Sequence, residues 1–77
     1  ADGCFIEGEV ENSILFRGVV VAKGAKVSNC VLMQGTMVKA GAQLSYVIAD
    51  KGVKVNADRM LMGHSTYPLA IAKDSVV

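Results

Sequence analysis

Residues 18–34, GVVVAKGAKVSNCVLMQ, are followed directly by residues 35–51, GTMVKAGAQLSYVIADK, and the two stretches share one pattern of glycine and aliphatic residues. The pattern extends in both directions with a constant spacing, which we call the repeat offset and define as the separation of Gly18 from Gly35. The columns that carry it are Gly18/Gly35/Gly52, Val21/Val38/Val55 and Val27/Leu44/Leu61. A fixed period of this kind predicts a solenoid, in which each repeat buries its apolar side only against its neighbours.

The apolar spacing inside each repeat is that of short strands. Val27, Leu32 and Val38 are separated by five and six residues, and a small or compact residue lies two positions before each of them. Inward residues at i−2 and i are typical of a strand, and no stretch shows the i, i+3, i+4, i+7 order of a helix. Three strands per repeat, joined by glycine turns and with Ala25 and Ala42 at corners, predict an all-β parallel β-helix of about three to four coils.

The two ends of the chain differ from the middle. At the start, Cys4 aligns with Val21 and Gly8 with Ala25, which predicts that the first coil keeps the repeat offset. Toward the other end, Asp58 takes the place of a corner glycine. This replacement predicts that regular coiling loosens near residue 57.

Residues 62–77 show no repeat. Tyr67 and Pro68 precede the alternating run Leu69–Ala72, which predicts a loop and a short strand that caps the open end of the coil. The domain assignment is therefore β-helix coils over residues 1–61 and a capping segment over residues 62–77. Because the sequence lacks an initiating Met and begins in repeat register, we interpret it as a fragment of a larger protein.

The composition fits a narrow core and argues against several function classes. Of the 77 residues, 52% are hydrophobic but only 5% are aromatic, so small branched side chains fill the interior. The net charge of +1 without a basic run argues against a nucleic-acid partner. No apolar run approaches the roughly 20 residues of a membrane span, and no signal peptide is visible. Cys4 and Cys30 are expected to be reduced, as in a cytoplasmic protein, with a disulfide between them as the alternative.

Strand alternation places five apolar side chains on the outside of one face, where a solenoid in water should be polar. These residues are Ile14, Phe16, Val31, Met33 and Ile48. A contiguous apolar stripe predicts a docking surface. The alternatives are that a small fragment exposes a few apolar groups without any function, or that the register is off by one residue here, so that the same side chains point inward.

His64 is the single histidine and the first residue to consider for catalysis. It lies outside the repeats, and no carboxylate is spaced to orient it as a general base. One histidine and two separated cysteines do not supply a zinc site. No GxxxxGK[ST] or GxGxxG motif marks a phosphate-binding loop. The sequence therefore predicts no catalytic residue, no cofactor-binding residue and no metal ligand.

Three strings of the sequence resemble one family. They are NSILFRGV (residues 12–19), CVLMQGT (residues 30–36) and VIADKGV (residues 47–53). Their wording and coil spacing resemble the C-terminal β-helix of glucose-1-phosphate adenylyltransferase (ADP-glucose pyrophosphorylase), over nearly the whole chain. The MQ and IADK strings resemble the regulatory-type subunit that accompanies the catalytic one in some bacteria.

The resemblance implies a left-handed coil and a parent that converts ATP and glucose 1-phosphate to ADP-glucose and pyrophosphate in glycogen biosynthesis. It implies that ATP and Mg²⁺ bind an N-terminal catalytic domain, against which this chain packs. The implied roles are those of a scaffold: oligomerisation, as a tetramer in the family, and allosteric regulation. Arg17, Gln34 and Lys51 share one column, and the resemblance implies that they face an anionic effector, with solvated strand ends as the alternative.

Two other parents remain open on the residues alone. Hexapeptide repeats also occur in acyltransferases, which use a single histidine and an acyl donor, and in sugar-1-phosphate uridylyltransferases of similar layout. An acyltransferase would require His64 to lie near a cleft between subunits. Whether the parent is itself catalytic or a regulatory subunit also stays open, although the fragment is not expected to catalyse a reaction.

Overall fold

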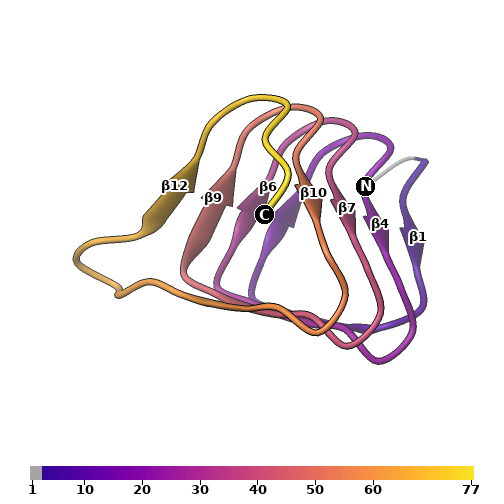
Figure 1. The fold of residues 1–77 in the computed structure, drawn as a ribbon, viewed down its shortest axis with the longest axis horizontal. Helices are drawn as coiled ribbons and strands as arrows, with labels where there is room; N and C mark the ends of the chain where they lie inside the picture. The colour runs from indigo at the N-terminus through magenta and orange to yellow at the C-terminus, as the bar shows by residue number, and fades with distance from the viewer. Residues whose placement is uncertain (1–2) are drawn as a thin grey trace.

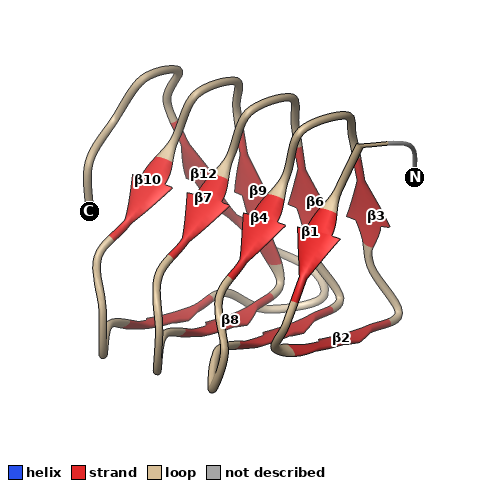
Figure 2. Cartoon of the chain, turned by 90° about the vertical axis from the view of Figure 1, so that its right-hand side faces the viewer, coloured by secondary structure: helices blue, strands red, loops and turns tan. Residues whose placement is uncertain are grey.

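A computed structural model describes residues 3–77, which form twelve short strands and no helix. The strands build three parallel sheets that stand as the sides of a prism, and the chain winds around the prism in successive laps (Figures 1 and 2). The predicted parallel β-helix is thus confirmed. Ala1 and Asp2, at the start of the predicted coil region, lie outside the described residues.

Each sheet takes one strand from every lap. The first sheet holds β1 (Phe5–Ile6), β4 (Val20–Val21), β7 (Met37–Val38) and β10 (Lys54–Val55). The second sheet holds β2 (Glu9–Glu11), β5 (Lys26–Ser28), β8 (Gln43–Ser45) and β11 (Met60–Met62). The third sheet holds β3 (Ile14–Leu15), β6 (Val31–Leu32), β9 (Val47–Ala49) and β12 (Leu69–Ile71).

The repeat offset of the sequence is the pairing register of the central laps. Val20 pairs with Met37 in the first sheet, and Val27 pairs with Leu44 in the second. Backbone hydrogen bonds also link the laps at the corners, as from the Lys26 N–H to the Ala42 carbonyl at 2.8 Å. Every strand of these laps is therefore hydrogen-bonded to the strand above it and to the strand below it. This pairing satisfies the hydrogen-bonding N–H and C=O groups of the strand backbone.

The core is a narrow column of small aliphatic side chains between the three sheets. Its members are at most 2% exposed and include Val21, Val38 and Val55 of the first sheet, Val27 and Leu44 of the second, and Leu32 and Ala49 of the third. Ala25 and Ala42 are fully buried at corners, as expected. Thr36 is the one buried polar side chain among the described residues, and its hydroxyl donates to the Asp50 carbonyl at 3.2 Å.

Two of the three corners turn on a glycine in the left-handed region of φ. Gly18 and Gly35 (φ 73° and 76°) lead from the third sheet to the first, and Gly24 and Gly41 (φ 83° and 76°) lead from the first to the second. These are the predicted glycine turns. Left-handed φ values are costly for residues with a Cβ atom, which explains why glycine recurs at these positions.

The third corner, from the second sheet to the third, uses single non-glycine residues with positive φ. Asn12, Asn29 and Tyr46 occupy it in successive laps, with φ of 54°, 53° and 52°. Asparagine adopts this conformation more readily than most residues. The Asn12 side chain also donates to the Asn29 side-chain oxygen at 3.1 Å, so that two laps are linked at this corner.

The first lap is shorter than predicted. Phe5 pairs with Val20 and Ile6 with Val21, which is two residues less than the repeat offset, so the predicted alignment of Cys4 with Val21 is wrong. The repeat offset is restored in the second sheet, where Glu9 pairs with Lys26. The physical reason is the first corner, where only Glu7 and Gly8 separate β1 from β2 and the turn formed by Lys23 and Gly24 in the next lap has no equivalent.

The last lap keeps its register longer than predicted. β11 pairs with β8 at the repeat offset through Met62, so the expected loosening near residue 57 is wrong. Asp58 takes the left-handed corner itself, with φ of 59°, and its N–H donates to the Ala40 carbonyl at 3.1 Å. An aspartate thus replaces the corner glycine without breaking the coil.

The final residues form a loop and then rejoin the coil. β12 pairs with β9, and Leu69 lies opposite Val47, which is five residues more than the repeat offset. The additional residues form the loop that protrudes before β12 (Figure 1). The expected loop and strand are present, and the strand extends the third sheet as its edge. None of the described residues belongs to a helix long and apolar enough to cross a membrane.

Candidate functional site

The outer face of the third sheet is the main candidate for a functional surface. Ile14, Val31 and Ile48 stack in register on it, and Ala70 continues the column in the last lap. The residues that follow Ile14 and Val31, which are Leu15 and Leu32, point into the core. The alternation therefore runs as predicted, and the register is not off by one residue.

A second apolar column runs beside the first. The Phe16 N–H donates to the Leu32 carbonyl and the Met33 N–H to the Ala49 carbonyl, at 2.9 and 3.0 Å, which places Phe16 and Met33 in successive laps of one ladder. Ile14 is 60% exposed and Phe16 48% exposed. The structure therefore brings all five predicted residues together on one outward surface, which we call the third-sheet face (Ile14, Phe16, Val31, Met33 and Ile48).

The third-sheet face changes character toward the last lap. Asp50 follows Met33 in its column, and the Asp50 N–H donates to the Ile71 carbonyl at 3.1 Å. One oxygen of its carboxylate accepts a hydrogen bond from the Lys51 N–H at 2.7 Å. The column thus passes from apolar side chains to a carboxylate that is held by the neighbouring backbone.

The predicted effector-facing residues form a row along the corner between the third and first sheets. The Gly35 N–H donates to the Arg17 carbonyl and the Gly52 N–H to the Gln34 carbonyl, which stacks Arg17, Gln34 and Lys51 lap upon lap. All three side chains are exposed. The row, which we call the corner row, therefore presents two cations and an amide to solvent.

Sequence reasoning missed the last member of the corner row. The Asp74 N–H donates to the Lys51 carbonyl at 2.9 Å, so Lys73 occupies the same turn position as Lys51. Asp74 takes the left-handed corner with φ of 60°, as Asp58 does at another corner. The sequence does place Lys73 directly before the corner residue Asp74, as it places Lys51 before Gly52. The alignment did not reveal this equivalence because the spacing here exceeds the repeat offset by five residues.

His64 lies in the protruding loop and is exposed. Its backbone pairs with Tyr67 through two hydrogen bonds, of 3.1 and 3.0 Å, which close the loop as a small antiparallel turn. The shallow depression beside it is lined by Met62, Gly63, His64, Tyr67, Pro68, Leu69 and Ala70. None of these lining residues is a carboxylate that would orient the imidazole as a general base.

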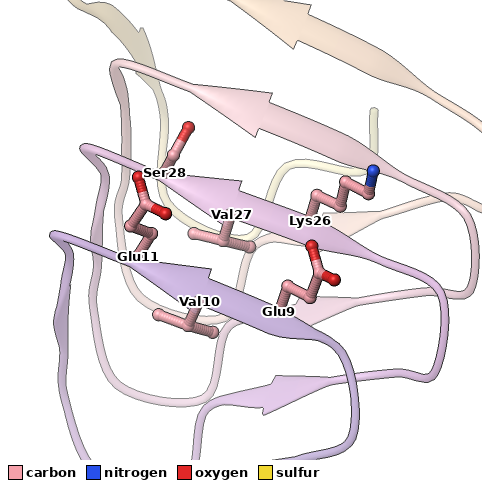
Figure 3. Close-up of a pocket in the computed structure, with 6 residues that line it drawn as sticks. All are labelled: Glu9, Val10, Glu11, Lys26, Val27 and Ser28. Atoms are coloured by element: carbon pink, nitrogen blue, oxygen red, sulfur yellow. The ribbon is translucent and has the colours of Figure 1, made fainter.

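The outer face of the second sheet is polar over β2, β5 and β8, whereas Met60 and Met62 of β11 are exposed in its last lap. A depression on it is lined by Glu9, Val10, Glu11, Lys26, Val27 and Ser28, and Figure 3 shows the two glutamates and the lysine on the strands β2 and β5. Glu9 is paired in register with Lys26, and Glu11 with Ser28. Val27 belongs to the core and the half-buried Val10 packs against it, so the depression offers charge at its surface and no enclosed site.

The two cysteines are free thiols in different surroundings. Cys4 is half-buried, whereas Cys30 is buried in the core. Burial raises the pKa of the Cys30 thiol, although hydrogen bonds with the backbone oppose that shift. Its sulfur donates to the Ser28 carbonyl at 3.1 Å, so the thiol acts as a packed core group.

We expect Cys4 to be alkylated at least about tenfold faster than Cys30 in the native protein, because the neutral, buried thiol is a poor nucleophile. Mass spectrometry after timed treatment with iodoacetamide at pH 8 measures both rates in one sample. Full unfolding in urea is the control and should bring the two rates together. Equal rates in the native protein would contradict the burial of Cys30.

The same pKa shift gives a pH dependence of stability. Because the pKa of Cys30 is raised in the folded chain, the thiol stays protonated to higher pH there than in the unfolded chain. The contribution of Cys30 to the free energy of unfolding is therefore complete at neutral pH and declines once the pH rises above the usual thiol pKa of about 8.5. The C30A variant should lose this alkaline decline relative to the unmodified chain. Urea denaturation at pH 7 and pH 10 measures the difference.

Comparison with known proteins gives short but close matches. Over 27 residues, the chain is 67% identical to the "Glycogen biosynthesis protein GlgD" of Geobacillus stearothermophilus and to that of Bacillus subtilis. Over 27 residues it is 70% identical to the glucose-1-phosphate adenylyltransferase of Clostridioides difficile. These matches cover 35% of this chain, 8% of each GlgD protein and 7% of the adenylyltransferase. They confirm the resemblance that the three sequence strings suggested.

No solved structure matches the chain significantly. The family model described as "GlmU-like, C-terminal hexapeptide" matches residues 1–67, which is most of the sequence. Both its hexapeptide character and its extent agree with the three-sided coil described above. The chain belongs to the GlmU-like C-terminal hexapeptide family.

Proposed function

We propose that the chain is the C-terminal scaffold domain of a cytoplasmic glucose-1-phosphate adenylyltransferase or of its GlgD-type subunit. The parent would make ADP-glucose and pyrophosphate from ATP and glucose 1-phosphate. Support comes from the family match together with close local identity to both kinds of relative. Both relatives are more than ten times longer than the matched segment, so the chemistry is assigned to the rest of the parent.

The observation that carries the scaffold role is the third-sheet face. Ile14 and Phe16 stand largely in solvent on a rigid sheet, and Met33 lies beside them. Burial of each large apolar side chain is worth about 1.5–3 kcal/mol, so a matching apolar surface would bind here with useful affinity. The proposed occupant is the parent's own N-terminal catalytic domain, which would also bring the subunits together as oligomers.

The corner row is the proposed regulatory element. Arg17, Gln34 and Lys51, extended by Lys73, border the third-sheet face and would line the edge of the domain contact. Guanidinium and ammonium groups at such an edge suit an anionic effector. ATP and Mg²⁺ are assigned to the parent's N-terminal catalytic domain, as the resemblance implies.

A chimera tests this proposal. The hexapeptide segment of the Clostridioides difficile adenylyltransferase that includes the matched residues is replaced by this chain. We expect the chimera to retain ADP-glucose synthesis and the oligomeric state of the parent, measured by pyrophosphate release and light scattering. The chain alone, mixed with ATP, Mg²⁺ and glucose 1-phosphate, should release no pyrophosphate.

The role of the third-sheet face is tested in the same chimera with the I14D/I48D variant. Two carboxylates on a buried contact should reduce assembled enzyme and its activity by at least about tenfold, because each unpaired buried charge is costly. The control is E9K/E11K, which changes charge on the exposed second sheet and should leave both readouts unchanged. An inactive chimera, or equal behaviour of the two variants, would overturn the proposal.

A further inference from the structure

One position on the outer surface of the third sheet is charged. Two outward columns form this surface, and Asp50 is the charged residue among Ile14, Val31, Ile48, Ala70, Phe16, Met33, Asp50 and Ala72. Its neighbours on the surface are Ile48 in its own lap, Met33 in the lap before and Ala72 in the lap after. The carboxylate therefore has apolar side chains on three sides.

Hydrogen bonds hold both the backbone and the side chain of Asp50 in place. Its N–H donates to the Ile71 carbonyl at 3.1 Å, and its carbonyl accepts from the Thr36 hydroxyl at 3.2 Å. One carboxylate oxygen accepts from the Lys51 N–H at 2.7 Å. An ionised carboxylate can accept about four hydrogen bonds, so this half-buried anion retains capacity for further donors.

The last lap leaves room beside Asp50. Ala70 and Ala72 occupy the outward positions there, opposite Ile48 and Asp50 of the preceding lap. Their strand β12 is the neighbour of β9 in the third sheet (Figure 1). Both alanines are exposed, and a methyl group is much shorter than the apolar side chains of the earlier laps. The surface therefore steps down next to the carboxylate, which gives a long side chain of a partner access to it.

A partner that covers the third-sheet face also removes water from Asp50. Ile48 belongs to that face and lies directly beside the carboxylate on the same side of the sheet. A charge that loses water without gaining a partner destabilises a contact. This penalty is the one expected for the I14D/I48D variant. The native carboxylate avoids it when the covering surface supplies a cation.

The apolar columns by themselves do not define one position for a partner. Ile14, Val31 and Ile48 present similar side chains in successive laps, and the laps are about 4.8 Å apart. A partner shifted by one lap would therefore meet a similar surface. In coiled coils, a single polar residue in a repeating apolar seam specifies the register. Asp50 breaks the repeat of this surface at one lap in the same way.

We propose that Asp50 binds a lysine or arginine side chain of the parent's N-terminal catalytic domain. This side chain lies over Ala70 and Ala72 and fixes the lap at which the catalytic domain docks. The inference rests on the proposed function, because it takes the catalytic domain as the occupant of the third-sheet face. A guanidinium or ammonium group fits because it donates to the carboxylate and neutralises its charge. The pair adds specificity for one docking position more than it adds affinity.

The D50N variant of the chimera tests the charge. Asparagine has the same shape and still offers an oxygen to the Lys51 N–H, so only the negative charge is lost. We expect at least about fivefold less assembled enzyme, measured by light scattering over a dilution series. D50K, which brings like charges together, should reduce assembly by at least about tenfold. The controls E11Q and E11K alter an exposed carboxylate of the second sheet and should leave assembly unchanged.

Charge reversal on the partner identifies the cation. In the D50K chimera, each lysine and arginine of the catalytic domain is replaced by glutamate, one at a time. One replacement should restore assembly, because its glutamate then meets the lysine of D50K. The same replacement should not restore the I14D/I48D variant. Restored assembly also shows that the D50K chain is folded.

The K51Q variant tests whether Asp50 instead serves the side chain of its own neighbour. Lys51 lies in the corner row, at the edge of the proposed contact, and its replacement should leave assembly unchanged. Equal losses for K51Q and D50N would overturn the proposal. Unchanged assembly in D50N and D50K would also overturn it, as would a failure of every charge reversal to restore D50K. These results reject the charge contact alone when I14D/I48D still disrupts assembly, whereas a chimera that tolerates I14D/I48D rejects the proposed function and this inference together.

Discussion

The L32A variant is expected to lower the free energy of unfolding by about 3 kcal/mol. Leu32 is fully buried, and it lies between Leu15 and Ala49 in the inward column of the third sheet. The alanine above it is too small to fill the space that the lost side chain would leave. A cavity therefore remains in a core that is only a few side chains wide.

Urea denaturation followed by circular dichroism measures this loss. The control is I14A, which removes an aliphatic side chain of the same size from the outer side of the same sheet. Because Ile14 is largely exposed, its replacement should change stability by less than about 0.5 kcal/mol. Similar losses for the two variants would show that the inward and outward assignments of this sheet are mistaken.

The G8A variant is expected to cost about 3 kcal/mol, the upper part of the range for overpacking. A Cβ atom at Gly8 would contact the carbonyl oxygen of Ala25 and would lie 2.6 Å from that of Ala22. Both are backbone atoms of the next lap, which cannot move without disturbing its hydrogen bonds. Gly8 does not have a left-handed φ, so the cost is one of space alone.

The matched control is G24A, which should introduce backbone strain without a steric collision, whereas G8A introduces a collision without backbone strain. Gly24 has φ of 83°, yet the atom nearest to an added Cβ would be the Gly41 nitrogen at 3.6 Å. We expect a smaller loss of about 1–2 kcal/mol, from backbone strain without collision. Thermal or urea unfolding of the two variants gives the comparison. A larger loss for G24A than for G8A would contradict the close approach of the first two laps.

The fold could be predicted from the sequence because a constant repeat specifies which residues pair between neighbouring laps. In a parallel coil, residues of one column lie on top of one another, so two residues separated by one repeat offset are neighbours in adjacent strands. Val21, Val38 and Val55 could be assigned to the core for this reason, and all three are buried. The same logic placed Ile14 and Phe16 outside, because strand alternation determines which side chains face water.

The candidate site was predicted only in part. The third-sheet face and the corner row were assembled from aligned columns, but the role of each remains a proposal. Lys73 was missed because five inserted residues shifted its column. The register of the first lap was predicted wrongly because Phe5 pairs with Val20, two residues short of the repeat offset. Both errors arose where the spacing departs from the repeat offset.

What the sequence alone determined was the architecture: a constant repeat offset, three strands per lap, and an inward column in each sheet. These features follow from the alternation of inward and outward residues along each strand and from the recurrence of similar residues in each column. Both can be read from the sequence. Only the tertiary structure decided how the irregular ends join the coil. A corner that loses two residues, or a lap that gains five, is recognised by which backbone groups meet across laps, and those hydrogen bonds link residues that no constant offset relates.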